Sequence, residues 1–318
     1  MKRPSMKISR LLKDGLKKKF FWIHRLLLRL KIAVYPVHYY SCAIDLLELE
    51  KSRALWAKPS SLPGLEIELN AQLQLLGQIC LPFEKEYRGN PFYRKAVGLN
   101  YGPGFGYIEA QVLHAVIRHS RPNQIIEVGS GVSTFCAHEA LKHNGQGAIV
   151  CIEPYPSKRL QELAVQEQAI KLLRSPVQAV SLSLFEGLQN GDILFVDSSH
   201  VVKTGSDVNF IILEVLPRLQ AGVIVHFHDI YLPYDYQRDL LVTFLHNNET
   251  ALLRAFLCFN KHFNILFCLS HLHYERPNEL RKIFSEYRPQ SNRDGLQDTR
   301  DLAGKHFPSS IWLRVVSK

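Results

Sequence analysis

The sequence lacks any long apolar segment. It has no run of about 18 uncharged apolar residues, roughly the length that a helix crossing a bilayer requires. It also lacks a signal-peptide pattern, because Arg25, Arg29 and Lys31 interrupt the apolar stretch near the N-terminus and no small-residue cleavage site follows. We therefore expect no transmembrane helix and a cytoplasmic protein.

Cysteine is scarce and shows no metal-binding or redox spacing. The 6 cysteines are widely separated, none forms a C-x-x-C pair, and several lie in apolar segments. This distribution favours buried free thiols in a reducing compartment over disulfides or a zinc site.

The body of the chain has no excess of either charge. The formal net charge is +10, from 39 lysine and arginine residues and 29 aspartate and glutamate residues. Residues 1–31 hold 11 of the basic residues but only one acid, Asp14, so the remainder of the chain carries 28 charges of each sign. A neutral body gives no electrostatic reason to bind DNA or RNA, and we expect no nucleic-acid partner.

The positive charge lies in a predicted N-terminal helix. Between residues 7 and 33, apolar residues recur at spacings of three and four, with lysines and arginines between them. A basic amphipathic helix containing Phe20, Phe21 and Trp22 could make a peripheral contact with an anionic membrane surface. The alternative is a helix packed on the domain or on a partner, with its basic face in solvent. We treat residues 1–35 as a separate N-terminal segment.

The next segment, residues 36–106, is expected to form a cap or lid region. It is rich in proline, tyrosine and leucine, with turn signals at residues 58–64 and 88–91. A short helical period runs through residues 66–76.

The sequence from residue 107 onward alternates between predicted helices and strands. Strands are expected at residues 124–128, 148–153, 177–180, 193–196, 222–227, 263–269 and 311–316. Helices are expected at residues 108–119, 134–143, 158–173, 207–219 and 235–246, with a further one inside 277–305. Because the strands are apolar without alternation, the pattern predicts an α/β domain over residues 107–318, with a doubly wound, Rossmann-like, mostly parallel sheet of seven strands. Ligands bind beyond the carboxyl ends of the strands in such folds.

A glycine loop follows the first predicted strand. Gly129 and Gly131 come directly after the strand and before a helix, where a backbone without Cβ atoms can approach a ligand closely. Glu127 lies two residues before Gly129, where its carboxylate could meet a cationic amino group. Glu153 ends the next strand, at the place where an acid binds ribose hydroxyls in dinucleotide-binding folds. A third glycine of the nicotinamide fingerprint would fall at Thr134.

Acids and histidines follow the fourth and fifth expected strand ends. Asp197 and His200 come after one buried strand, and His228 and Asp229 come after the next. Such groups are costly to bury without partners, so their clustering indicates a site. Two interpretations remain open: the aspartates, with one histidine, hold a divalent cation, or one histidine is a general base that a carboxylate orients.

Residues 101–236 resemble the Methyltransferase-24-type family of class I S-adenosylmethionine-dependent methyltransferases. The matching segments are Gly106–Ala110, Glu127–Thr134, Val196–Asp207 and His228–Tyr236, and Pro36–Tyr40 is similar to bacterial members. Here Ser133 stands where the fullest form of the glycine motif has a third glycine. Ser133 and the following Thr134 still supply hydroxyl and backbone N–H groups.

The resemblance implies an S-adenosylmethionine site and a role for Asp197 near the methyl group. The expected cofactor-binding residues are Glu127, Gly129, Ser130, Gly131, Ser133, Thr134, Glu153 and Asp197. Some relatives are Mg²⁺-dependent O-methyltransferases with a pair of acidic or amide residues after strand five. Asp197 and Asp229 are the candidate metal ligands here, but the second member of that pair is Ile230, which argues against a catechol-type metal site.

We therefore expect O-methylation of a small-molecule or sugar hydroxyl. The expected catalytic residues are His200, His228 and Asp197, and the expected walls of the acceptor pocket are Tyr107, Tyr231, Tyr234 and Tyr236. One alternative is a nicotinamide-dependent oxidoreductase on a similar sheet, against which Thr134 argues. Another is a non-catalytic cofactor-fold binding module tethered by its basic helix.

Overall fold

The computed structural model describes residues 10–37, 40, 43–102, 104–298, 300 and 302–316. The chain divides into two compact units, residues 1–56 and 57–318. The first unit contains three helices: α1 (Arg10–Arg29), α2 (Leu46–Lys51) and α3 (Arg53–Trp56). Asp45 caps α2, since its carboxylate accepts hydrogen bonds from the backbone N–H groups of Leu47 and Glu48.

Helix α1 confirms the helix expected from the sequence, and residues 7–9 of that expectation lie outside the described residues. Large apolar side chains along it are exposed, among them Leu16, Phe21, Trp22 and Ile23. In the described parts of the chain, no helix is both long and apolar enough to cross a membrane.

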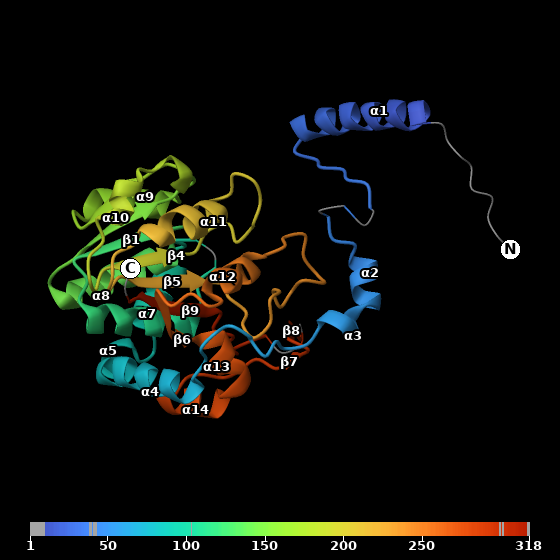
Figure 1. The fold of residues 1–318 in the computed structure, drawn as a ribbon. Coiled ribbons are helices and arrows are strands. Elements are labelled where there is room, and N and C mark those ends of the chain that lie inside the picture. The colour runs from blue at the N-terminus through green and yellow to red at the C-terminus, as the bar shows by residue number, and fades with distance from the viewer. Residues whose placement is uncertain are drawn as a thin grey trace. The chain divides into compact units, whose positions relative to one another are not determined.

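The second unit is built on one seven-stranded sheet (Figure 1). Its strands are β1 (Gln124–Val128), β2 (Ala148–Ile152), β3 (Ile170–Leu173), β4 (Ile193–Val196), β5 (Ile224–His228), β6 (Phe263–Cys268) and β9 (Ser310–Val315). They lie in the order β3-β2-β1-β4-β5-β9-β6. The pairs from β3 to β5 are parallel, and β9 is antiparallel to both β5 and β6. This confirms the predicted doubly wound, mostly parallel sheet of an α/β fold.

The strands are apolar on both faces because helices cover both faces. Along β1, Ile125 belongs to one hydrophobic cluster and Ile126 to the other, as the alternation of side chains along a strand requires. The helices of the second unit are α4 (Leu69–Cys80), α5 (Glu84–Tyr87), α6 (Pro91–Gly98), α7 (Tyr107–Ser120), α8 (Val132–Asn144), α9 (Lys158–Gln166), α10 (Leu182–Glu186), α11 (Asp207–Phe210), α12 (Glu249–Leu257), α13 (Leu269–Glu275) and α14 (Pro277–Ile283). Short helical turns η1 (Leu81–Phe83), η2 (Val177–Ala179), η3 (Ile211–Val215) and η4 (Leu216–Arg218), and a hairpin of β7 (Asn292–Arg293) and β8 (Leu296–Gln297), complete the unit.

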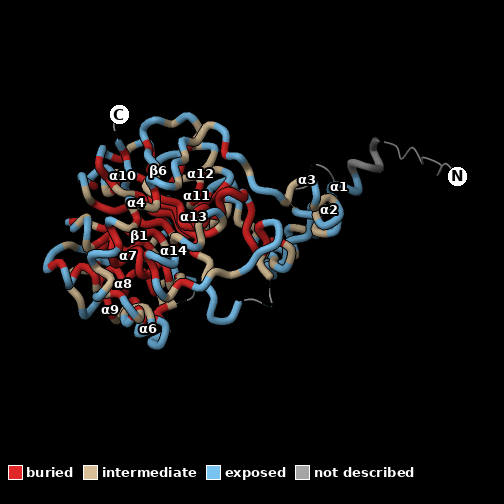
Figure 2. Tube along the Cα trace, turned by 90° about the horizontal axis from the view of Figure 1, so that it is seen from below, coloured by how far each residue is buried: buried red, intermediate tan, exposed pale blue. Residues whose placement is uncertain are grey.

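One side of the sheet packs against α4, α7, α8 and α14, and the other packs against α10, the α11–η3 segment and α12. In Figure 2 the buried part of the second unit runs through these layers. Helix α7 has ten consecutive buried residues, Ile108 to Ile117, so neighbours cover it on all sides.

Three expectations for the second half of the chain are wrong. The helix expected over residues 158–173 ends at Gln166, and its last part is strand β3. The strand expected at residues 177–180 is the helical turn η2. The helix expected at residues 235–246 is a run of turns, and the helix of this region, α12, begins at Glu249. Ile170 to Leu173 pairs with β2 along its length, so tertiary pairing there overrides the local helical period.

The expected lid region contains a segment that packs on the sheet. Helix α4 contributes Leu76, Ile79 and Cys80 to the core cluster of the second unit. The structure divides the chain between Trp56 and Ala57, and the boundaries expected after residues 35 and 106 stay predictions. A lid function for residues 36–106 stays a prediction.

Candidate functional site

The glycine loop after β1 lies directly against the end of β4. Gly129 has φ +80°, in the left-handed region that favours glycine, and a Cβ placed on it would lie 1.7 Å from the backbone oxygen of Asp197. The N–H of Asp197 in turn donates a hydrogen bond to the carbonyl of Val128. The absence of a side chain at residue 129 therefore brings the glycine loop and Asp197 together at one edge of the sheet.

Glu127 holds the glycine loop to the start of α8. Its two carboxylate oxygens accept hydrogen bonds from the hydroxyl of Ser133, at 2.7 Å, and from that of Thr134, at 2.5 Å. The Thr134 hydroxyl also accepts the N–H of Gly131 at 2.9 Å. Burial raises the pKa of Glu127 to about 7, although the Thr134 and Ser133 hydroxyls favour its charged form. The three side chains are thus engaged with one another, and their predicted contact with a cofactor stays a prediction.

Glu153 lies beside the same loop at the end of β2. Its carboxylate accepts hydrogen bonds from the backbone N–H of Ser130, at 3.3 Å, and from that of Tyr155, at 2.8 Å. The segment at Tyr101 and Gly102 passes over the other side of the loop, since a Cβ on Gly131 would lie 3.4 Å from the Tyr101 carbonyl oxygen. A half-buried carboxylate next to a tight glycine loop fits the ribose and amino-acid parts of S-adenosylmethionine.

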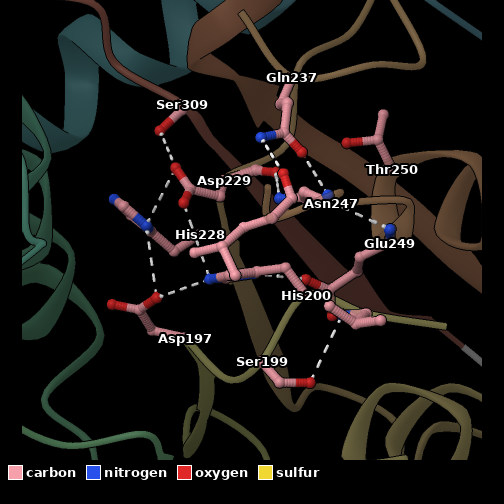
Figure 3. Close-up of polar contacts among 12 residues, drawn as sticks. Asp197, Ser199, His200, His228, Asp229, Gln237, Asn247, Glu249, Thr250 and Ser309 are labelled. Carbon is pink, nitrogen blue, oxygen red and sulfur yellow. Dashed lines mark hydrogen bonds and ion pairs between the residues drawn. The ribbon is translucent and has the colours of Figure 1, made fainter. Parts of the chain in front are cut away.

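The ends of β4 and β5 bring all four expected polar side chains together (Figure 3). The Nε2 atom of His200 lies 3.3 Å from Asp197 Oδ1 and 3.7 Å from Asp229 Oδ2. The Nδ1 atom of His228 lies 3.5 Å from Asp197 Oδ1 and 3.5 Å from Asp229 Oδ1. We refer to Asp197, His200, His228 and Asp229 as the strand-end cluster.

Two residues of the strand-end cluster have unusual backbone conformations. His200 has φ +58° and Asp229 has φ +54°, both in the left-handed region. That region costs a residue with a Cβ roughly 1 kcal/mol, and such residues gather at functional sites. The loops after β4 and β5 thus adopt strained conformations where they present their polar side chains.

The charges of the cluster support one another. Burial disfavours ionised Asp197, but His228 and then His200 outweigh it, and they hold the pKa of Asp197 well below its usual range. Burial also disfavours charged histidines, yet the hydrogen bonds that His200 donates to Asp197 and Glu249 raise its pKa to about 10. Asp197 and Asp229 likewise hold the pKa of His228 well above its usual value. His200 is therefore a cation at neutral pH that donates hydrogen bonds to carboxylates, and the acids around His228 favour its charged form.

Distant parts of the chain complete the cluster. Glu249, the first residue of α12, is completely buried, and its Oε2 lies 2.8 Å from Nδ1 of His200. Glu109 of α7 lies 3.7 Å from Nε2 of His228, and Ser309 donates a hydrogen bond to Asp229 Oδ1 at 2.8 Å. The sequence analysis named none of the three as site residues. A glutamate at a predicted helix start can indicate a site residue, but only the fold shows which histidine it contacts.

The loop before α12 also fixes the cluster through the backbone. The N–H groups of Asn248 and Glu249 donate to the carbonyl of His200, and the Asn247 side-chain amide donates to the carbonyl of Asp229. Asn247 itself is held by a hydrogen bond from its N–H to Gln237 Oε1. Residues 237–249 therefore form the outer wall of the strand-end cluster.

The strand-end cluster does not fit a divalent cation well. Carboxylate oxygens bind Mg²⁺ and Ca²⁺ at about 2.0–2.6 Å, and they must converge on one point. Here the imidazole of His200 lies between the two carboxylates, and the two histidines face different oxygens of Asp229. Across the described ranges, no group of three or more His, Cys, Asp or Glu side chains is arranged to hold a metal ion. The expected Mg²⁺ has no support in this geometry.

The four tyrosines expected to wall the acceptor pocket have packing partners. Tyr231 stacks on Phe307, and Tyr234 makes edge contacts with Tyr236 and Tyr274. A further hydrogen bond joins the Tyr236 hydroxyl to the carbonyl of Asp294 at 2.7 Å. Tyr107 of α7 donates a hydrogen bond from its hydroxyl to Glu286 and stacks on His306. Their role toward an acceptor stays a prediction. Of the segment Pro36–Tyr40, which is similar to bacterial family members, residues 38 and 39 lie outside the described residues.

Comparison with known proteins defines the family. A family model described as a methyltransferase domain matches residues 126–230, which include both the glycine loop and the strand-end cluster. A protein of Archaeoglobus fulgidus, itself uncharacterised, is 31% identical over 170 residues, which cover 50% of this chain and 75% of the relative. This chain belongs to the class I S-adenosylmethionine-dependent methyltransferases. Glu109, Glu249 and Ser309 lie outside the segment of this methyltransferase that the family model matches.

Solved structures similar to this methyltransferase are distant. An O-methyltransferase of tomaymycin synthesis from Streptomyces achromogenes, solved with S-adenosylmethionine, is 14% identical and covers 76% of this chain and 96% of its own, with a TM-score of 0.44. An O-methyltransferase from Bacillus cereus, solved with S-adenosylhomocysteine, is 12% identical and covers 76% of this chain and 99% of its own, with a TM-score of 0.44. The family assignment rests on the family model.

Proposed function

We propose that this methyltransferase transfers the methyl group of S-adenosylmethionine to a hydroxyl oxygen of a small molecule or a sugar. The observation that carries this proposal is the contact between the glycine loop and the strand-end cluster at Gly129 and Asp197. A cofactor on that loop and an acceptor at that cluster would lie side by side. Holding two reactants in line supplies much of the rate of a transfer between them.

The cofactor half of the proposed site consists of the glycine loop and Glu153. S-adenosylmethionine, when bound, supplies an electrophilic methyl group on a sulfonium. Glu153 would accept hydrogen bonds from the ribose hydroxyls, and the backbone of Gly129 to Gly131 would lie against the amino-acid part. Asp197, whose carboxylate stays ionised, would stabilise the positive charge beside it.

The acceptor half consists of the strand-end cluster. His228, whose ring nitrogens have no hydrogen-bond partner among the described residues, would donate a hydrogen bond to the acceptor oxygen. Both ring nitrogens of His200 face carboxylates, so His200 would hold those carboxylates in place. Neither imidazole would remove the hydroxyl proton. The hydroxyl proton becomes strongly acidic as the oxygen–carbon bond forms, so a carboxylate suffices to accept it. Asp229 is the better placed acceptor, because its side chain is 33% exposed against 20% for Asp197. The carbon–sulfur bond breaks, and the proton goes to this carboxylate.

Calorimetric titration with S-adenosylhomocysteine tests the cofactor half. We expect binding by the wild type, loss of at least about tenfold in affinity in Glu153→Ala, and no change in the control Glu186→Ala, an acid on α10 outside the site. Selective binding of NAD in place of S-adenosylhomocysteine would favour the oxidoreductase alternative. Binding without transfer to any hydroxyl would favour the non-catalytic module.

We also propose that α1 lies on an anionic membrane surface. Two features support this: Phe21 and Trp22 are exposed, and Lys17, Lys18 and Lys19 adjoin them. Apolar side chains that insert at the interface and lysines that meet acidic headgroups together give such a helix its affinity.

Sedimentation of the full chain with vesicles that contain anionic lipid tests this second proposal. We expect binding that falls with added salt and is weakened in Trp22→Ala. Tyr155→Ala is the matched control, since Tyr155 is an aromatic of the second unit that is 89% exposed. Equal binding by both variants, or no binding to anionic vesicles by the wild type, would contradict a membrane role for α1.

A further inference from the structure

His200, like His228, lies between Asp197 and Asp229, and it also makes the shortest ion-pair contact of the cluster, with Glu249 (Figure 3). Its Nε2 atom faces Asp197 Oδ1 and Asp229 Oδ2, at 3.3 and 3.7 Å, and its Nδ1 atom faces Glu249 at 2.8 Å. One imidazole thus meets carboxylates from three elements, namely the end of β4, the end of β5 and the start of α12.

A carboxylate at each ring nitrogen defines the charge of this imidazole. Ionised carboxylates only accept hydrogen bonds, so Nε2 of His200 carries hydrogen toward Asp197. Burial raises the pKa of Glu249 and His200 favours its charged form; beside ionised Glu249, Nδ1 carries hydrogen as well. A ring with two N–H groups is a cation. It has no lone pair on Nε2 with which to bind a metal ion.

Glu249 holds the ring in this orientation. Its side chain is completely buried at the start of α12, and a buried carboxylate without a cationic partner would be strongly unfavourable. The backbone carbonyl of His200 is held in addition by the N–H groups of Asn248 and Glu249. Asn248 also accepts the N–H of Val202 at 2.6 Å, so the α12 side of the site anchors the whole loop after β4.

Two aspartates at adjacent strand ends repel each other unless a cation lies between them. In a metal-dependent site a divalent cation meets this need. We propose that the His200 imidazolium, held by Glu249, takes the place of a divalent cation between Asp197 and Asp229, and that this protein positions its acceptor without a metal. The proposal deepens the proposed function and rests on it for the identity of the acceptor half.

A divalent cation and the His200 imidazolium would both offset the repulsion between Asp197 and Asp229, but they would behave differently. A metal ion would bind the acceptor oxygen directly, and a chelator would remove it. A histidine side chain held by a buried glutamate cannot be removed by a chelator. Removal of His200 should therefore open a place with a net negative charge, and that place should attract a divalent cation which the wild type excludes.

Calorimetric titration of the full chain with Mn²⁺ tests the proposal. We expect no binding of millimolar Mn²⁺ by the wild type. We expect His200→Ala to bind Mn²⁺ roughly a hundredfold more tightly than any residual wild-type binding, because a fixed positive charge about 4 Å from each aspartate has been removed. His119→Ala, which removes an exposed histidine of α7, is the matched control and should behave as the wild type.

His200→Ala leaves Glu249 buried without its partner, so that variant can fail to fold. The double variant His200→Ala/Glu249→Gln removes that charge and keeps the test sound; it too should gain Mn²⁺ binding. Tight Mn²⁺ binding by the wild type that is lost in His200→Ala would overturn the proposal, because His200 would then be a metal ligand. Absence of Mn²⁺ binding by the folded double variant would also overturn the proposal, because the space between Asp197 and Asp229 would then not suit a cation.

The same protein samples titrated with S-adenosylhomocysteine keep this test separate from the proposed function. If the wild type binds S-adenosylhomocysteine in the presence of a chelator but also binds Mn²⁺, the role of His200 is wrong while the methyltransferase site stands. If it binds neither compound, the metal-independent cluster stands while the proposed function fails.

Discussion

Glu127 and Asp197 are both acids at buried strand ends on adjacent strands, yet their environments are opposite. Glu127 meets neutral hydroxyl and thiol groups, and burial raises its pKa to about 7. Asp197 meets His228 and His200, which outweigh its burial and hold its pKa well below the usual range. The first region uses a carboxyl group to organise a backbone loop, whereas the second keeps a charge ready for chemistry. The difference shows that burial alone does not identify a catalytic acid; the partners of the acid do.

The two regions contact each other at Gly129, and a substitution there should have the largest effect. Gly129→Ala should abolish S-adenosylhomocysteine binding and destabilise the fold by more than about 4 kcal/mol, since its Cβ would overlap the Asp197 carbonyl. Gly145→Ala is the matched control: Gly145 has φ +69°, but its Cβ would meet no atom within 4 Å, so only the left-handed strain of about 1 kcal/mol applies. Urea denaturation and titration measure both effects. Equal losses in the two variants would mean that the contact with Asp197 has no special role.

Removing the charge of Asp197 tests the second region. Asp197→Asn should leave two neighbouring imidazolium groups without their shared anion and lower the free energy of unfolding by about 3–5 kcal/mol. The surface aspartate Asp298, in an exposed pair with Arg300, is the control, and Asp298→Asn should cost less than about 1 kcal/mol. Denaturation at pH 7 provides the measurement. A stability change at Asp197 as small as that at Asp298 would contradict the paired-charge account.

The pH dependence of stability tests the first region. The pKa of Glu127 is raised in the folded state, so its contribution is complete below the ordinary pKa of 4.5 and is lost as pH rises toward 7. Over that window the wild type should lose about 3 kcal/mol relative to Glu127→Gln, at about 1.4 kcal/mol per pH unit. Urea denaturation of both proteins from pH 4.5 to 8 measures the difference. A difference independent of pH would show that Glu127 is ionised in the folded protein.

The smallest expected effect concerns the outer contacts of the strand-end cluster. Ser309→Ala removes the hydroxyl that donates to Asp229 and should cost about 1.5–3 kcal/mol, the range for a hydrogen bond to a charged group. Ser175→Ala, an exposed serine whose hydroxyl contacts only the next carbonyl, should be nearly neutral. Thermal unfolding would compare the two. An equally small change in unfolding temperature for both variants would mean that the Ser309 hydroxyl does not stabilise the site.

Much of this organisation could be predicted from the sequence, and its limits have physical causes. Strands β1, β2, β4 and β5, the glycine loop and the four members of the strand-end cluster all lie within residues 124–229, so local patterns and the parallel-sheet rule place the loop and the cluster at one edge. Strand β3 was missed because its pairing with β2, and not its own periodicity, determines its conformation. Glu249 and Ser309 were missed because they reach the cluster from segments far away in the sequence.

The charge states could not be read from the sequence either. The pattern left His200 and His228 open as bases or metal ligands, and only the distances to Asp197, Asp229 and Glu249 show that they are surrounded by acids. Likewise, the sequence does not show that the hydroxyls of Ser133 and Thr134 meet Glu127, and the contact of these residues with a cofactor stays a prediction. Side-chain direction depends on the packing of the whole unit.

Transfer of a labelled methyl group from S-adenosylmethionine to a panel of sugar, phenol and polyketide-like hydroxyl compounds tests the central claim most directly. The account predicts a labelled product with the wild type, formed equally with and without a chelator of divalent cations, and a loss of at least about a hundredfold in rate in Asp197→Asn. Equal rates in the wild type and in folded Asp197→Asn, or a product that disappears on chelation, would contradict it.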